Sequence, residues 1–125
     1  MPIEKTNYLL SQLPISDLEF IRPHLHRFDL IQGDVLVEQG KPADYVYFPH
    51  SGLLSLVVHL KDSDGVEAVM VGSDGILGPT TAMANPPSNN ETVVQLSGNS
   101  SRLSVSMYKE VHAQSAGVRS LGRPL

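Results

Sequence analysis

The sequence predicts a mainly β protein, an antiparallel β-roll or jelly roll flanked by short helices at both ends. Between Phe28 and Gly52, each short apolar run is followed by a glycine, which marks a tight turn. Further along, residues 53–60 alternate so that one face of the expected strand is wholly apolar. Strands punctuated by turns at this spacing are typical of small antiparallel barrels and rolls.

The same patterns give the expected strands and turns. Asp64 and Gly65 end a polar turn that joins residues 53–60 to residues 66–71 as a hairpin. Three further stretches rich in Gly, Pro, Ser and Asn are expected as turns or loops, at 72–75, 84–90 and 97–101. The expected strands lie at 28–31, 35–37, 45–48, 53–60, 66–71, 92–96 and 102–105.

Two short helices are expected before the strands. Either Thr6 or Asn7 is placed to cap the first helix, which Pro14 stops. The segment Ser16–Glu19 has the spacing of a capping box and opens the second helix. Pro23 is expected to break or kink that helix.

A final helix is expected to begin near Ser104 or Ser106, with Met107 and Val111 turned inward. The sequence leaves open whether Val118 also turns inward or forms an exposed apolar patch with Leu121 that promotes self-association. The expected organisation is one domain, with N-terminal helices at 1–27, the β-roll at 28–105 and the start of a truncated C-terminal helix at 106–125.

Composition limits the function classes. The chain has 125 residues, 41% of them hydrophobic, which suffices for one core. It has no cysteine, which excludes disulfides and Cys-ligated metals. It shows neither a signal peptide nor a run of about 18 apolar residues, so a cytoplasmic location is expected. The net charge is -4 and no arginine lies between Phe28 and Ser101, so this chain alone is expected not to bind DNA.

Histidines and serines suggest neither a metal site nor an enzyme. His24 and His26 converge only if their segment is extended, and surface positions are the favoured interpretation. His50 is expected in a turn. No serine lies in a nucleophile elbow, so no catalytic residue is predicted.

Two other clusters are also given structural interpretations. Asp62 and Asp64 are expected at a solvated hairpin tip, because a calcium loop would need a longer series of ligands. The aromatic run from Tyr45 to Phe48 is expected in the core, because only Lys41 and Lys61 are basic residues near enough to support nucleic-acid stacking.

Four motifs, in this order, resemble the cyclic-nucleotide-binding-like sensory domain of the Crp/Fnr group of bacterial transcription regulators. They are NYLLSQLP followed by DLEF, Gly33-Asp34 with Gly40, VYFPHSG and VMVGSDGILG, and the resemblance covers residues 7–121. It implies a roll that senses a small effector. It also implies a dimer helix and a helix-turn-helix beyond Leu121, both of which are expected to be missing here, with a homodimer possible only if the C-terminal helix is completed.

The resemblance also implies how a nucleotide would be held, by a Gly-Glu segment and by an arginine across the following loop. The equivalent segment here is 75–81, where neither Ile76 nor Pro79 can supply the carboxylate. Residues 89–92 stand across the loop without an arginine. A buried cyclic phosphate keeps its charge and needs a guanidinium, and an inward Glu91 would repel it.

We therefore expect the fold to be kept and the usual binding of cyclic AMP or cyclic GMP to be lost. No cofactor is predicted, and the pocket either takes an unknown, neutral or weakly polar effector or is filled by Ile76, Leu77 and Met83. The alternative functions are a protein-interaction module that docks through the roll or the last helix and, less favoured, a small cupin-type enzyme. The candidate ligand-binding residues are Gly75, Ile76, Leu77, Gly78, Pro79, Thr80, Thr81, Asn90, Glu91 and Thr92.

Overall fold

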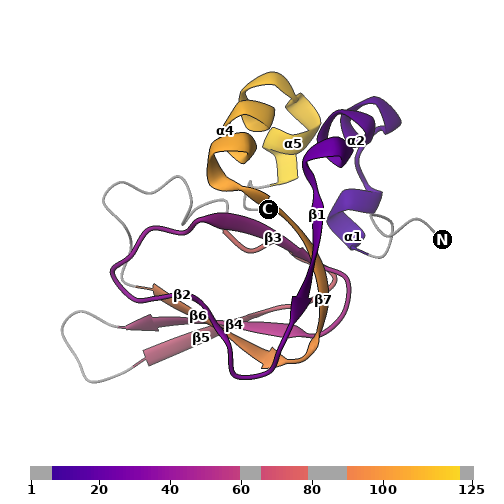
Figure 1. The fold of residues 1–125 in the computed structure, drawn as a ribbon. Coiled ribbons are helices and arrows are strands. Elements are labelled where there is room, and N and C mark those ends of the chain that lie inside the picture. Colours follow the sequence, from indigo (N-terminus) through magenta and orange to yellow (C-terminus); the bar gives the residue numbers. More distant parts are fainter. Residues whose placement is uncertain (1–6, 60–65, 79–89, 122–125) are drawn as a thin grey trace.

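The computed structural model describes residues 7–59, 66–78 and 90–121, which form two antiparallel sheets with helices gathered beside one of them (Figure 1). The three-stranded sheet has the order β1 (His26–Leu30), β7 (Gly98–Ser104), β3 (Tyr45–Pro49). The four-stranded sheet has the order β2 (Val35–Val37), β6 (Asn90–Leu96), β4 (Leu53–His59), β5 (Val66–Val71). The predicted mainly β fold with short flanking helices is confirmed.

Most strands lie where the sequence predicts them. The bounds of β2 and β5 agree with the predicted ones, and β4 pairs with β5 from Leu54↔Val71 to His59↔Val66, as the predicted hairpin requires. The turn of that hairpin, including Asp62 and Asp64, lies outside the described residues.

The predicted loop at 97–101 is wrong, because β7 already begins at Gly98. This segment is polar, yet it is the central strand of its sheet and pairs with both β1 and β3. Ser100 and Ser101 are buried, with exposed fractions of 0% and 2%. A serine-rich strand resembles a loop in the sequence because its buried hydroxyls are satisfied by contacts that only the tertiary structure supplies.

The N-terminal helices are α1 (Tyr8–Ser11), α2 (Ile15–Ile21) and the 3₁₀ helix η2 (Arg22–His24). Asn7 caps α1, since its Oδ1 accepts a hydrogen bond from the Leu10 N–H over 3.1 Å. The predicted capping box is wrong, because α2 begins directly after Pro14 and has no side-chain cap. Pro23 lies within η2, where the tighter turn accommodates it.

The C-terminal segment is two helices rather than the predicted single one, α4 (Val105–Gln114) and α5 (Ala116–Leu121). Ser104 caps α4 by accepting from the Met107 N–H over 3.2 Å. Ser115 has extended backbone angles that end α4, and its hydroxyl accepts from the Val118 N–H in α5 over 3.1 Å. Val118 is 0% exposed, so the alternative of an exposed patch at that residue is wrong.

The buried residues form two clusters on opposite faces of the three-stranded sheet. β3 shows the division, because Val46 and Phe48 face the helices while Tyr45 and Tyr47 face the other sheet. The helix-facing core consists of Leu10, Leu13, Leu18, Ile21, Val46, Phe48, Leu103, Tyr108, Val111 and Val118. The roll-facing core consists of Leu30, Tyr47, Leu54, Leu77 and Val94.

One contact joins the helices of the two chain ends, which Figure 1 shows lying together. The Ser115 hydroxyl donates to Asp17 Oδ1 over 2.6 Å, so the junction between α4 and α5 is held by α2. Among the described residues, no helix is long and apolar enough to cross a membrane.

Candidate functional site

The start of the predicted ligand segment is occupied by packing contacts. Ile76 is half-buried against the helix-facing core, and Leu77 belongs to the roll-facing core. The backbone of Leu77 exchanges two hydrogen bonds with Tyr47, of 2.9 and 3.0 Å. Asn7 Nδ2 holds the preceding turn by donating to the carbonyl oxygens of Gly75 over 2.9 Å and Pro49 over 2.7 Å.

Gly78 is the last described residue of this segment. Its φ of +114° disfavours any side chain, and an added Cβ would lie 3.3 Å from the Tyr45 carbonyl oxygen. The backbone therefore passes close to the start of β3. Pro79, Thr80 and Thr81 lie outside the described residues, as does Met83.

The candidate residues across the loop lie at the start of β6. Thr92 is 2% exposed and shares a strand face with Val94 of the roll-facing core, so it faces the interior. Glu91 has the opposite strand parity and is half-buried on the other face, so the condition under which its carboxylate would repel a phosphate is not met. Asn90 opens the strand and pairs with Val58.

Of the described candidates, the structure thus brings Leu77 and Thr92 to the roll interior and directs Ile76 and Glu91 away from it. The predicted set is not assembled as one constellation by the described residues.

The sequence analysis missed an arginine inside the roll. Arg102 of β7 has its guanidinium carbon 3.8 Å from the ring centroid of Phe28 and 3.8 Å from that of Tyr45. It is cross-strand partner to His26 on one side and Tyr47 on the other, so the three side chains share one face of the sheet. The expectation that only Lys41 and Lys61 are basic residues near the aromatic run is wrong.

Arg102 also hydrogen bonds to the hydroxyl of Tyr47. Burial raises the pKa of Tyr47, while this bond and the positive charge of Arg102 act in the opposite direction. We call Arg102, Phe28, Tyr45 and Tyr47 the arginine clamp. A signal for it exists in the sequence, because strand alternation from Gly98 places Leu103 on the helix-facing side and Arg102 on the roll side.

A pocket of about 320 Å³ adjoins the arginine clamp through Tyr45 and His26. His24 and His26 both line it, because η2 gives way to an extended strand between them, and this is the condition under which the sequence allowed them to converge. No group of three His, Asp or Glu side chains suited to a metal occurs in the described part of the chain. The pocket is lined by Pro23, His24, His26, Tyr45, Ser104 and Met107.

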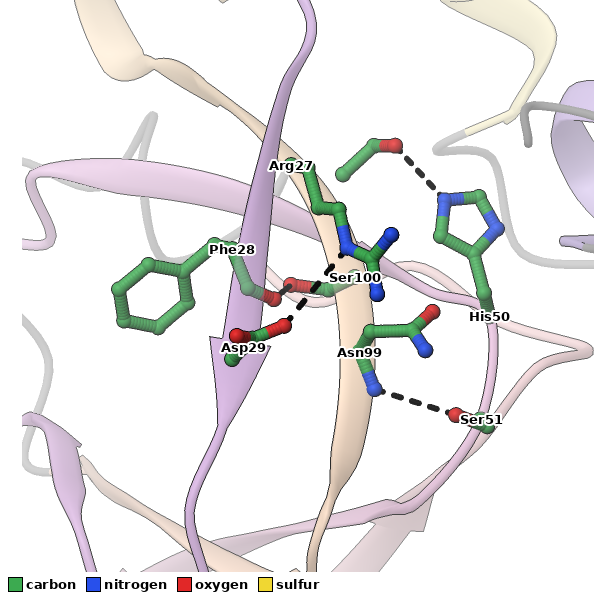
Figure 2. A network of polar contacts seen from close by, with 8 residues as sticks. Arg27, Phe28, Asp29, His50, Ser51, Asn99 and Ser100 are labelled. Carbon is green, nitrogen blue, oxygen red and sulfur yellow. Dashed lines mark hydrogen bonds and ion pairs between the residues drawn. The ribbon is translucent and has the colours of Figure 1, made fainter.

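A second polar cluster joins β1, β7 and the end of β3 (Figure 2). His50 Nε2 lies 2.7 Å from the Ser101 hydroxyl oxygen. His50 lies in the turn between β3 and β4, as the sequence predicts, but it is 8% exposed, so the surface interpretation is wrong for this histidine. A serine beside an imidazole is the pairing that nucleophilic enzymes use. Here the hydroxyl-bearing Ser101 is only 2% exposed and is out of reach of a substrate.

The other hydrogen bonds of this cluster join side chains to backbone groups. The Ser100 hydroxyl donates to the Phe28 carbonyl oxygen over 2.9 Å, and the Asn99 N–H donates to Ser51 Oγ over 3.1 Å. Figure 2 shows the first bond joining β7 to β1 and the second joining β7 to the turn after β3. The cluster is therefore a structural support for the three-stranded sheet.

Comparison with known proteins gives one family match. Residues 28–106 match the family model described as cyclic nucleotide-binding domain. No curated protein sequence matches the chain.

Several solved structures share the fold. The sensor domain of the transcriptional regulator DNR from Pseudomonas aeruginosa is 14% identical, with a TM-score of 0.69 over 95% of this chain and 84% of that one. The Thermus thermophilus catabolite activator protein is 15% identical, with a TM-score of 0.72 over 90% and 53%. The regulatory domain of Toxoplasma gondii PKA, crystallised with cAMP, is 17% identical, with a TM-score of 0.68 over 87% and 41%. The chain thus spans about half or less of the last two.

Proposed function

The chain belongs to the cyclic nucleotide-binding domain family, and we propose that it is the effector-sensing domain of a Crp/Fnr-type transcription regulator that does not bind cAMP or cGMP in the usual mode. The observation that carries this proposal is the packing of the residues that follow Gly75. Ile76, which takes the place where a carboxylate would receive the ribose hydroxyl, packs against the helix-facing core instead.

The charge balance of the segment supports the same proposal. A buried cyclic phosphate requires a cation and several N–H donors to replace its water. Losing a charge-assisted hydrogen bond costs about 1.5–3 kcal/mol, and neither candidate segment, 75–81 or 89–92, contains an arginine to form one. Leu77, which precedes Gly78, fills part of the roll interior with an apolar side chain.

Sensing requires a path from the roll to the C-terminal helices, and the contacts at the start of α4 offer one. The Val105 N–H donates to the Asp44 carbonyl oxygen next to β3 over 2.9 Å, and Ser104 both ends β7 and caps α4. A ligand that binds one arrangement of this junction more tightly would shift the helices toward it. Such a domain binds and transmits, and it performs no chemistry of its own.

The test is a calorimetric titration of the purified chain with cAMP and with cGMP. The regulatory domain of Toxoplasma gondii PKA, which was crystallised with cAMP, serves as the positive control. We expect the control to bind and this chain to give no heat of binding at micromolar nucleotide. Micromolar or tighter binding of either nucleotide would overturn the proposed loss. Native mass spectrometry of the same sample then shows which small molecule, if any, remains on the chain.

A protein-docking function is the alternative, and one observation favours it. Among the described strands, β5 lies at the edge of the four-stranded sheet, and Val69 and Met70 on it are 51% and 52% exposed. Exposed apolar residues on an open strand edge are a common site for strand addition. Replacing both residues with lysine would abolish such docking while leaving effector binding unchanged. A pull-down that compares the unchanged protein with this double variant therefore separates the two functions.

A further inference from the structure

We propose that the end of the three-stranded sheet beside α4 binds a small organic anion, whose carboxylate or phosphate oxygens accept hydrogen bonds from the guanidinium edge of Arg102. The residues that form this place are not among the candidate ligand-binding residues at 75–81 and 90–92 considered above. The inference depends on the proposed function only in giving the anion the role of effector.

The geometry of Arg102 determines what it can still bind. Phe28 and Tyr45 lie against its guanidinium, each ring centroid 3.8 Å from the guanidinium carbon, so the group is stacked and its orientation is restricted. The edge of the group carries five N–H donors, and Tyr47 accepts from it. The remaining edge donors suit two coplanar oxygens, as in a carboxylate or a phosphate.

Within the described part of the chain, Arg102 forms no ion pair. Asp44 is close enough to influence the pKa of Tyr47, but among the described residues it forms no ion pair with Arg102. Arg102 is half-buried, so it has lost part of its water without gaining an anionic partner among the residues that the structure describes. A partly desolvated cation of this kind gains more from an external anion than a fully hydrated surface arginine would.

The adjoining pocket has the size and lining for an organic ligand. Its volume of about 320 Å³ is at the lower end of the range for small-molecule sites, roughly 300–1,000 Å³. His24 and His26 supply imidazole groups, while Pro23 and Met107 supply apolar surface. An anion seated on Arg102 could therefore extend its carbon skeleton past Tyr45 into this space.

The pocket also touches the element that would report its occupancy. Met107 lines the pocket and packs against the helix-facing core from the first turn of α4. Ser104 lines the pocket and caps the same helix. A bound anion would thus contact the start of α4 directly.

The test is an NMR titration of the isotope-labelled chain with succinate and, separately, with inorganic phosphate, each up to about 10 mM. The signals followed are the side-chain Nε–H of Arg102 and the backbone amides of Tyr45 and Met107. We expect a saturable shift of all three signals with at least one of the two anions. Succinate alone would identify a carboxylate ligand, and phosphate alone would identify a phosphate ligand.

Two variants separate binding from general charge effects. Arg102→Gln should weaken binding by at least about tenfold, because it removes the charge and the fork. Arg27→Gln is the matched control, because Arg27 is exposed on the neighbouring strand and paired with Asp29, and it should bind as the unchanged protein does. If Arg102→Gln fails to fold, His26→Gln replaces it, since His26 is exposed and lines the pocket.

Absence of a saturable Arg102 shift with either anion overturns the proposal, as does undiminished binding by Arg102→Gln. The nucleotide titration above is independent of this result. A chain that binds succinate and also binds cAMP would keep this inference and lose the proposed function, whereas a chain that binds neither would lose only this inference.

Discussion

The two faces of the three-stranded sheet differ in chemistry although they are built from the same strands. On the face toward the helices, Val46, Phe48 and Leu103 are apolar and at most 1% exposed. On the face toward the other sheet, Tyr47 and Arg102 bring a hydroxyl and a cation into a partly enclosed space.

This difference separates stability from function. Apolar burial stabilises without needing a partner, whereas a buried polar group is costly unless it is hydrogen bonded. The helix-facing side meets the first condition at Val46, Phe48 and Leu103. Its buried Ser101 is hydrogen bonded to His50, whereas the hydroxyl of Tyr108 has no hydrogen-bond partner among the described residues. On the roll-facing side, the polar groups are satisfied by specific contacts of Arg102. A ligand could replace some of those contacts on this side.

The largest expected effect comes from the helix-facing side. Phe48→Ala should lower the free energy of unfolding by about 3–5 kcal/mol, because it leaves a cavity under the helices. Phe48 is 0% exposed. The matched control is Phe20→Ala on α2, where the ring is 38% exposed and the loss should be well below that of Phe48→Ala. Urea denaturation measures both, and equal losses would contradict the role assigned to this face.

The next effect tests the register of β7, on which the separation of Leu103 from Arg102 depends. A Cβ added at Gly98 would overlap the backbone of Ser51, so Gly98→Ala should lower the free energy of unfolding by about 1–3 kcal/mol. Gly72→Ala is the control, because its nearest neighbour would be an ordinary 3.6 Å away. Thermal melts of the two variants should differ clearly. A Gly98→Ala protein as stable as the unchanged one would show that the backbones at Gly98 and Ser51 are not tightly packed.

The sequence predicted the apolar half of this architecture well. β-Branched residues between turn signals predict strands such as Val35–Val37 and Val66–Val71, and the bounds predicted for both are correct. Asn7 was one of two candidate caps, and only the structure selected it. Local patterns carry such features because the residues that determine them are neighbours in the chain.

The polar half was not predictable in the same way. Ser100 and Ser101 are typical of a loop until the strands on both sides are known, since their hydroxyl partners are Phe28 and His50, far away in sequence. The position of Arg102 between two rings likewise depends on pairing β7 with β1 and β3. Contacts of this kind are set by tertiary structure, which no local periodicity encodes.

Two tyrosines allow the same substitution to be made on both faces, with opposite expected signs. Tyr47→Phe removes the acceptor of an Arg102 hydrogen bond and should lower stability by about 1–2 kcal/mol. The Tyr108 hydroxyl is buried and has no hydrogen-bond partner in the described part of the chain. Tyr108→Phe should therefore raise stability by about 1 kcal/mol. Denaturation at neutral pH measures both, and changes of the same sign would contradict the comparison.

The pH dependence of the same variants gives the smallest and most specific effect. Burial raises the pKa of Tyr108 above the ordinary value of 10.0. As pH rises above 10.0, the unfolded chain releases the phenolic proton first, so the folded state loses stability until pH passes the raised value. Tyr108→Phe lacks this group and should lose less stability than the unchanged protein over that interval. Parallel alkaline denaturation curves for the two proteins would show that the hydroxyl is not desolvated.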